Sequence, residues 1–131
     1  MMGSPVVSLD HMILRVRNQA ESVRFYQQIL AFKHEGRADP FDILRVHEGF
    51  TLDLMEQVPR DQVHLAFCLE RAAFEAVHLR LMQLNIPFGN EPFDRTGGSV
   101  AKSLGARGMA DSLYFYDPDE HNIEIRTYES R

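Results

Sequence analysis

Alternating apolar and polar positions open the chain. Over residues 9–16, one set of alternate positions is apolar, and the other carries His11, Ile13 and Arg15. A period of two predicts a half-buried β-strand, because successive side chains of a strand point to opposite faces. Residues 18–32 then bring apolar side chains to helical spacing, which predicts an amphipathic helix.

Three short extended runs follow this helix. They cover residues 33–36, 42–47 and 51–56, and Gly49 separates the last two as a hairpin turn. Pro59 closes this half of the chain. The first half therefore predicts the order strand, helix and three strands.

The same order returns in the second half. Residues 62–69 alternate like the first strand, and residues 71–86 repeat a helical stripe of apolar side chains before Pro87. A glycine-rich loop then leads to a final hairpin, with strands predicted at 112–117 and 122–127. The chain thus looks like an internal duplication.

The two halves also repeat their chemistry. His11 and His64 lie on the non-core faces of the two opening strands. Asp53 and Glu124 each lie between two apolar residues of a closing strand. A histidine on the first strand and an acid on the last strand is therefore a duplicated arrangement.

Ionisable groups on one sheet face are costly if they stay unpaired in a partly dry cavity. A divalent cation removes that cost, because two imidazoles and one or two carboxylates form a common coordination shell. Such a shell also leaves positions open for water or substrate, as a catalytic site requires. We therefore expect Glu124 to face one divalent metal ion, and the ligand types suit Fe, Mn, Ni, Co or Zn alike.

Composition narrows the class of protein. The 131 residues suit a single α+β domain, 1–131, with one module at about 6–58 and another at about 61–129. A net charge of −5 without a Lys/Arg run gives no support for nucleic-acid or membrane partners. The single cysteine, Cys68, excludes an internal disulfide framework and fits a reducing cytoplasm. It is expected to be a buried thiol on the face of His64.

Four segments carry a family resemblance: LDHMILRV, AESVRFYQQILAF, VHLAF and LYFYDPDEHNIEI. They resemble the vicinal oxygen chelate superfamily, which includes glyoxalase I, fosfomycin-resistance enzymes, extradiol dioxygenases, methylmalonyl-CoA epimerase and the metal-free bleomycin-resistance proteins. The Asp-Pro-Asp-x-x-Asn turn followed by Ile-Glu-Ile is the most specific part. The resemblance implies tandem βαβββ modules that curl into a partial barrel around the site, usually within a homodimer.

The resemblance also implies metal ligands at His11, His64 and Glu124. A fourth family ligand falls at Asp53, which is shorter than the usual Glu. Asp53 is therefore alternatively a general base, a residue that contacts a metal ligand rather than the metal, or a solvated residue. The final hairpin is most similar to the fosfomycin-resistance and virulence-associated branches. Ile13 stands where the fosfomycin enzymes have Thr, which counts against fosfomycin as the substrate.

Four residues are candidates for catalysis. Asp53 and Glu56 are candidate proton carriers, with a solvated acid as the alternative for each. Tyr114 and Tyr116 share a face, and pairing across the final hairpin would place them beside Glu124 to donate a hydrogen bond to substrate. The alternative is that the two tyrosines only fill the barrel.

The glycine-rich loop carries the candidate substrate-binding cations Arg95, Lys102 and Arg107. They meet an anionic substrate group if the loop folds over the cavity, and they are solvated if it does not.

The sequence therefore predicts a metal-dependent enzyme that chelates a small, oxygen-rich, anionic substrate and stabilises an oxyanion or enolate. Lyase, hydrolase and transferase chemistry all fit these ligands. The alternatives are a metal-free protein that sequesters a drug, as bleomycin-resistance proteins do, and an extradiol-type dioxygenase. We expect a cytoplasmic homodimer with a small-molecule substrate.

Overall fold

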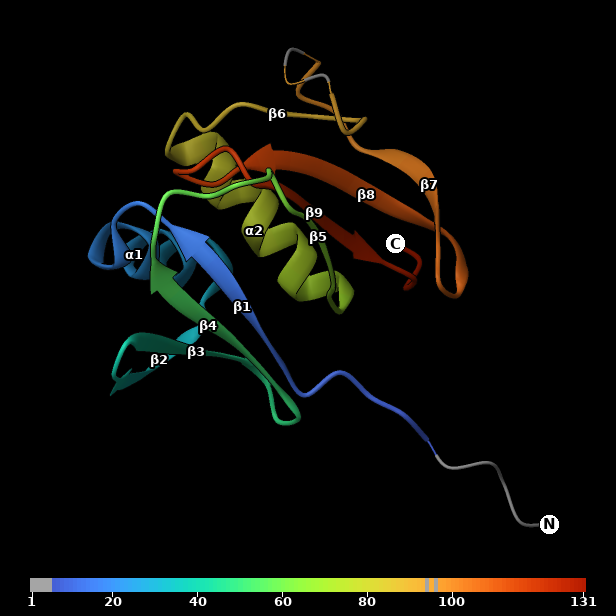
Figure 1. Cartoon of the computed structure of the whole chain (residues 1–131). Coiled ribbons are helices and arrows are strands. Elements are labelled where there is room, and N and C mark those ends of the chain that lie inside the picture. The colour runs from blue at the N-terminus through green and yellow to red at the C-terminus, as the bar shows by residue number, and fades with distance from the viewer. Residues whose placement is uncertain (1–5, 94, 96) are drawn as a thin grey trace, which may run out of the picture. The chain divides into compact units, whose positions relative to one another are not determined.

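The structure is a computed structural model of the chain, and it describes residues 6–93, 95 and 97–131. The chain divides into two compact units, Met1–Pro59 and Arg60–Arg131. Each unit contains one β-sheet and one helix packed on it, so the predicted α+β class is confirmed (Figure 1). Within the described residues, neither helix combines the length and the apolar character needed to cross a membrane.

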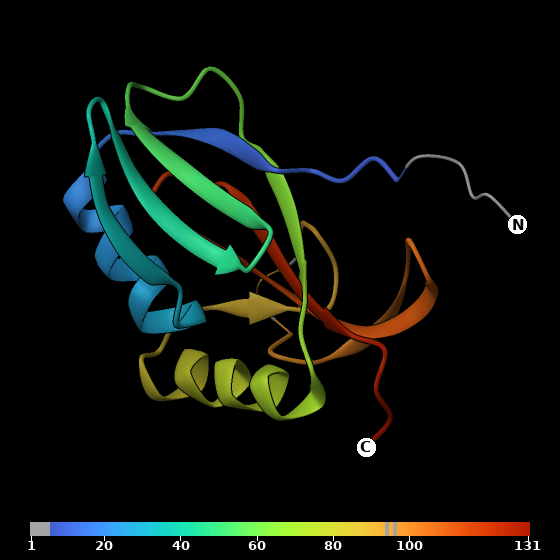
Figure 2. The ribbon, with the colours of Figure 1, turned by 90° about the horizontal axis from the view of Figure 1, so that it is seen from below.

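The first unit is a βαβββ module. Its elements are β1 (His11–Val16), α1 (Gln19–Leu30), β2 (Lys33–Ala38), β3 (Phe41–His47) and β4 (Phe50–Glu56). The strands lie in the order β1-β4-β3-β2, with β1 parallel to β4 and the other neighbours antiparallel. Two parallel strands need a crossover connection, and α1 lies within that connection and covers one face of the sheet (Figure 2).

Helix α1 begins at a residue suited to cap it. Asn18 has extended backbone angles, and its side-chain oxygen accepts a hydrogen bond from the Glu21 N–H, one of the free amides of the first turn. The apolar stripe of α1 packs against the sheet, where it contacts β4, β3 and β2. Buried residues of this core include Val23, Tyr26, Ile29, Leu30, Leu14, Val16, Leu52 and Leu54. Each such burial contributes about 1.5–3 kcal/mol, and the opposite face of the sheet carries His11, Asp53 and the isoleucines beside Asp53.

The second unit repeats this plan. Its elements are β5 (His64–Cys68), α2 (Arg71–Gln83), β6 (Phe88–Gly89), β7 (Ala101–Gly105), β8 (Gly108–Tyr116) and β9 (Asn122–Thr127). The strand order is β5-β9-β8-β6, with β7 paired to β8. Strand β5 is parallel to β9, as β1 is to β4. The predicted return of the order strand, helix and strands is therefore seen in the second unit, with β7 as an additional strand.

One face of the second sheet packs against α2, and a tight turn joins its last two strands. The buried residues of this core are Phe74, Val77, Leu81, Leu113, Phe115, Ile123 and Ile125. In the turn, the buried Asp117 Oδ1 accepts hydrogen bonds from the backbone N–H groups of Asp119 and His121. The Asp-Pro-Asp turn is thus architectural, as its residue types predict.

The structure differs from the prediction in the segment before the final hairpin. The expected loop contains β6 and β7, and β8 begins at Gly108 rather than at residue 112. The glycines hid these strands from pattern analysis, because glycine usually weakens a strand. Cys68 is exposed rather than buried. It is the last residue of β5, which lies at the edge of its sheet.

Candidate functional site

Glu124 and His64 come together on the face of the second sheet that points away from α2. Strands β5 and β9 lie side by side, with Ala66 opposite Glu124. His64 Nε2 lies 3.2 Å from Glu124 Oε1. The Glu124 side chain is buried, whereas the imidazole is half-exposed. The structure thus brings two of the three predicted ligands into contact.

The geometry of this pair fits a shared divalent ion. Two atoms bound to one ion at about 2.1 Å each, with a tetrahedral angle of about 109° between them, lie about 3.4 Å apart. The 3.2 Å separation of His64 Nε2 and Glu124 Oε1 is close to this value, and it is also the distance of a direct hydrogen bond. Imidazole and carboxylate suit Fe, Mn, Ni, Co and Zn alike, so the donor set does not select one of these metals.

The second oxygen of Glu124 is held by a buried arginine. Arg126 Nη1 donates to Glu124 Oε2 at 2.6 Å, and both side chains are 6% exposed. Ser103 Oγ lies 3.4 Å from the same Oε2 and 2.7 Å from Ser112 Oγ. Burial alone would lower the pKa of the Arg126 guanidinium, but hydrogen bonds to Glu124 and Tyr128 raise it above its usual range. The arginine therefore stays charged.

Both candidate tyrosines lie on the same face as this pair. Tyr114 is opposite Glu124 in the register of β8 and β9, and its ring centroid is 6.1 Å from that of His64. Tyr116 is opposite Asn122. Tyr114 is buried and Tyr116 reaches the surface, so the two phenols have different access to a bound molecule.

A hollow of about 390 Å³ opens beside His64. Within the described part of the chain, its lining residues all belong to the second unit: Gln62, His64, Pro92, Phe93, Tyr116 and Asn122. This volume lies in the range of small-molecule sites, and the walls combine aromatic and prolyl carbon with two side-chain amides. The hollow therefore suits a small molecule with both apolar and hydrogen-bonding parts.

Arg95 contacts two residues that line this hollow, although it does not line the hollow itself. Its guanidinium lies 3.9 Å from the centroid of the Tyr116 ring, and it donates to Asn122 Oδ1. Both of those residues line the hollow. Arg95 also donates to the backbone carbonyl groups of Glu91 and Pro92.

The other two candidate cations lie on the hairpin β7–β8. Lys102 Nζ pairs with Asp111 Oδ1 at 2.9 Å. Arg107 lies over the Tyr128 ring, 4.2 Å from its centroid. Each therefore already has a partner within the second unit, and neither lines the hollow beside His64.

In the first unit, His11 and Asp53 share the sheet face that points away from α1. The register pairs Ile13 with Asp53, and His11 lies on the same face two positions before Ile13. His11 Nδ1 is 2.7 Å from Asp10 Oδ2. This hydrogen bond, with a smaller contribution from the charge of Asp53, raises the pKa of His11. A histidine held at Nδ1 by a carboxylate presents Nε2 to a metal.

Asp53 lies between two isoleucines and interacts electrostatically with two basic side chains. The register places it between Ile13 of β1 and Ile43 of β3, and its charge acts on His11 and Arg45. Its Oδ1 is buried and has no hydrogen-bond partner among the described residues. A buried carboxylate oxygen in that state costs stability, and a cation bound on this face would reduce the cost.

Glu56 lies on the other face of β4. It follows the core positions of that strand, and its Oε1 accepts a hydrogen bond from the Gln19 N–H at 3.1 Å. The structure therefore does not bring Glu56 together with His11 and Asp53. Its carboxylate instead caps the first turn of α1.

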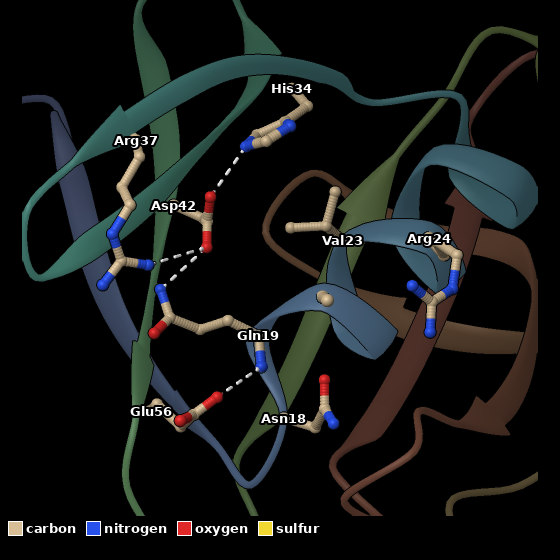
Figure 3. Close-up of a pocket in the computed structure, with 9 residues that line it drawn as sticks. Asn18, Gln19, Val23, Arg24, His34, Arg37, Asp42 and Glu56 are labelled. Atoms are coloured by element: carbon tan, nitrogen blue, oxygen red, sulfur yellow. Dashed lines mark hydrogen bonds and ion pairs between the residues drawn. The ribbon is translucent and has the colours of Figure 1, made fainter.

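A second hollow, of about 430 Å³, lies at the start of α1 (Figure 3). Asp42 is at its centre and accepts hydrogen bonds from Gln19 Nε2 and His34 Nε2, each at 2.9 Å. Arg37 Nη1 approaches the same carboxylate at 3.5 Å. Because these groups satisfy one another, they form a junction that joins α1 to β2 and β3.

Neither unit by itself gathers three His, Cys, Asp or Glu side chains into a metal-binding group within residues 6–93, 95 and 97–131. The second unit supplies His64 and Glu124 on one sheet face. The first supplies His11 and Asp53 on one sheet face. Each unit thus carries a histidine and an acid, as the duplication predicts.

Sequence analysis missed three residues around these groups. Arg126 carried a signal, because it follows Glu124 by two positions and so lies on the same strand face. Asp10 reaches His11 although neighbours on a strand point apart, which is possible because β1 begins only at His11. Ser103 carried no signal, since its strand was expected to be a loop.

The family model of the Glyoxalase/Bleomycin resistance protein/Dioxygenase superfamily matches residues 8–125. The chain belongs to this superfamily. Its two units of a strand, a helix and further strands, each with a parallel pair (β1–β4 and β5–β9), agree with that membership.

Individual members are similar over nearly the whole chain. The metallothiol transferase FosB of Bacillus licheniformis is 23% identical over 131 residues, which cover 97% of this chain and 79% of that protein. The solved structure of the oxidase ChaP-H2 has a TM-score of 0.83 at 25% identity. The match covers 95% of this chain and 96% of the ChaP-H2 chain. The virulence protein STM3117 from Salmonella typhimurium has a TM-score of 0.74 at 24% identity, and the match covers 96% of this chain and 100% of the STM3117 chain. The predicted glyoxalase-like fold is therefore confirmed, as is the resemblance to the fosfomycin-resistance and virulence-associated branches.

Proposed function

We propose that this protein is a divalent-metal-dependent enzyme that acts on a small oxygen-bearing molecule. The observation that carries the proposal is the 3.2 Å contact between His64 Nε2 and the buried Glu124 Oε1, in a superfamily that includes metal-dependent enzymes. His11, oriented by Asp10, is the proposed third ligand. It comes from the same chain or from a second copy in a homodimer, and the two units act as one domain.

A divalent ion held by three protein ligands polarises a substrate oxygen and stabilises negative charge on it. Residues of this chain supply the other roles. Tyr116, which lines the hollow beside His64, donates a hydrogen bond to the substrate, whereas the buried Tyr114 lies opposite Glu124 and does not line that hollow. Asp53, whose buried Oδ1 has no hydrogen-bond partner among the described residues, holds the transferred proton. Glu56 has no catalytic role in this proposal, because it contacts α1.

The substrate binds in the hollow beside His64. Its carbon skeleton contacts Pro92 and Phe93, and Tyr116 closes one side of the hollow. Arg95 contacts Tyr116 and Asn122, which line this hollow, so it is the cation proposed to meet an anionic substrate group. Lys102 and Arg107 would take part only after leaving Asp111 and the Tyr128 ring.

For the reaction we favour addition of water or a thiol to a small electrophile. A lyase reaction on such an electrophile fits equally. The similarity to a metallothiol transferase over most of both chains supports this choice. The similarity to the oxidase ChaP-H2 supports a second candidate, an oxygen-consuming reaction of the extradiol type. Both reactions use the same ligands.

A metal-by-substrate screen tests the proposal. Protein loaded with each of Fe, Mn, Ni, Co and Zn is assayed with fosfomycin and thiols, with 2-oxoaldehydes and glutathione, and with catechols and oxygen. We expect turnover by metal-loaded protein in one arm, and its loss in His64→Ala and Glu124→Ala. A catalytic rate unchanged by chelation or by both substitutions would contradict the proposal and favour a metal-free role.

A further inference from the structure

The two oxygens of Glu124 have different surroundings. Oε1 faces His64 Nε2 at 3.2 Å, on the side of the half-exposed imidazole. Oε2 accepts a 2.6 Å hydrogen bond from the charged Arg126. A charge-assisted hydrogen bond of that length is strong, so Oε2 is fixed on the arginine and Oε1 alone is presented to His64.

The Arg126 guanidinium is itself held in place by the hairpin β7–β8. Nη1 donates to Ser103 Oγ at 3.0 Å as well as to Glu124. Nη2 donates to the backbone carbonyl groups of Ser103 at 3.1 Å and of Gly108 at 3.2 Å. Four acceptors around one planar group leave it a single orientation, which an ammonium group could not reproduce.

Gly105 on β7 makes room for this guanidinium. A Cβ at that position would lie 2.3 Å from Arg126 Nη2 and 2.4 Å from its Cζ. Any other residue at position 105 would therefore push the guanidinium away from its acceptors. Both β7 and β8 thus contribute to where Arg126 lies.

We propose that Arg126 is a positioning residue that restricts Glu124 to binding a divalent ion through Oε1 alone. This inference rests on the proposed function, because it requires an ion shared by His64 and Glu124. Arg126 also balances the charge of the buried carboxylate before the ion arrives, which avoids an unpaired buried charge. It touches neither substrate nor ion and acts only through Glu124.

Arg126→Met tests the inference, because methionine keeps most of the side-chain length but cannot donate to Oε2. Glu124 is then free to rotate, to bind with both oxygens or to turn away. We expect the affinity for Co(II), measured by competition with a chelator, to fall about tenfold or more. The visible d–d absorption of bound Co(II) should also change, because it depends on the number and arrangement of ligand atoms.

Two further variants separate the effect of the position of the Arg126 guanidinium from the effect of its charge. Gly105→Ala displaces the guanidinium without removing any functional group, and we expect the same spectral change with a smaller loss of affinity. Arg126→Lys keeps the charge but not the planar fork, and its affinity should lie between those of the wild type and Arg126→Met.

Arg37→Met is the control. Arg37 lies in the first unit, where it pairs with Asp39 at 3.0 Å and with Asp42 at 3.5 Å. The control therefore also replaces an arginine that is paired with carboxylates, but it leaves Glu124, Arg126 and the hairpin β7–β8 untouched. It should keep the wild-type affinity and Co(II) spectrum, with folding of every variant checked by circular dichroism.

The outcomes distinguish this inference from the proposed function. If the wild type binds no Co(II), the proposed function fails and the inference fails with it. If the wild type binds Co(II), and folded Arg126→Met and Gly105→Ala bind it with the same affinity and spectrum, the inference alone is overturned.

Discussion

At the scale of single residues, the two candidate acids are held in opposite ways. Glu124 is buried but fully engaged, with Arg126 on one oxygen and His64 on the other. Asp53 has a buried oxygen with no hydrogen-bond partner among the described residues, between two isoleucines. Such a cost is typical of functional positions, where stability is given up for chemistry.

Asp53→Val tests whether the Asp53 carboxylate serves function rather than the fold. Valine suits a strand and packs well between Ile13 and Ile43. We expect the metal-free variant to be more stable than the metal-free wild type by about 1–3 kcal/mol, as measured by urea denaturation in the presence of a chelator. A less stable variant would show that the carboxylate supports the fold.

At the scale of elements, the hairpin β7–β8 links the candidate site to α2. Asp111 on β8 accepts hydrogen bonds from Arg71 of α2 and is paired with Lys102 of β7. These contacts lower the pKa of Asp111 below its ordinary value, and the hydrogen bond from Arg71 has a larger effect than the one from Lys102. The same hairpin carries Ser103 and Gly105, which position Arg126.

The lowered pKa of Asp111 predicts how stability depends on pH. Its contribution is present above the ordinary carboxyl pKa of 3.8 and is lost as the pH falls through the lowered value in the folded protein. We expect Asp111→Asn to lower the free energy of unfolding at neutral pH by about 1–3 kcal/mol. The difference from the wild type should shrink below pH 3.8. Urea denaturation at neutral and acidic pH measures both values, and a difference that does not change with pH would contradict this account.

The elements with a regular period could be predicted from the sequence, whereas β6 and β7, in the glycine-rich segment, could not. The period of two in β1 and β5 placed His11 and His64 on the non-core faces. It could also have placed Arg126 beside Glu124, because the two residues are two positions apart on β9. It could not identify the partners of Arg126, since Ser103 and Gly108 come from a hairpin that reads as loop. The face of a residue follows from local pattern, whereas its partner depends on long-range strand pairing.

At the scale of the whole molecule, duplication explains why each unit carries a histidine and an acid. Each parallel pair, β1–β4 and β5–β9, joins the opening strand of a unit to its closing strand. A histidine on one and an acid on the other therefore lie on neighbouring strands in both units. The superfamily match over residues 8–125 spans both copies, so the duplicated plan belongs to the family.

Metal content is the most direct test of the central claim that His64 and Glu124, completed by His11, hold one divalent ion. Protein purified without added metal or chelator is analysed for bound metal as wild type and as His11→Ala, His64→Ala and Glu124→Ala. The control is His47→Ala, an exposed histidine in the hairpin β3–β4. We predict about one ion per wild-type and control chain, and its loss from the other three variants. Unchanged metal content in His64→Ala and Glu124→Ala would contradict the account.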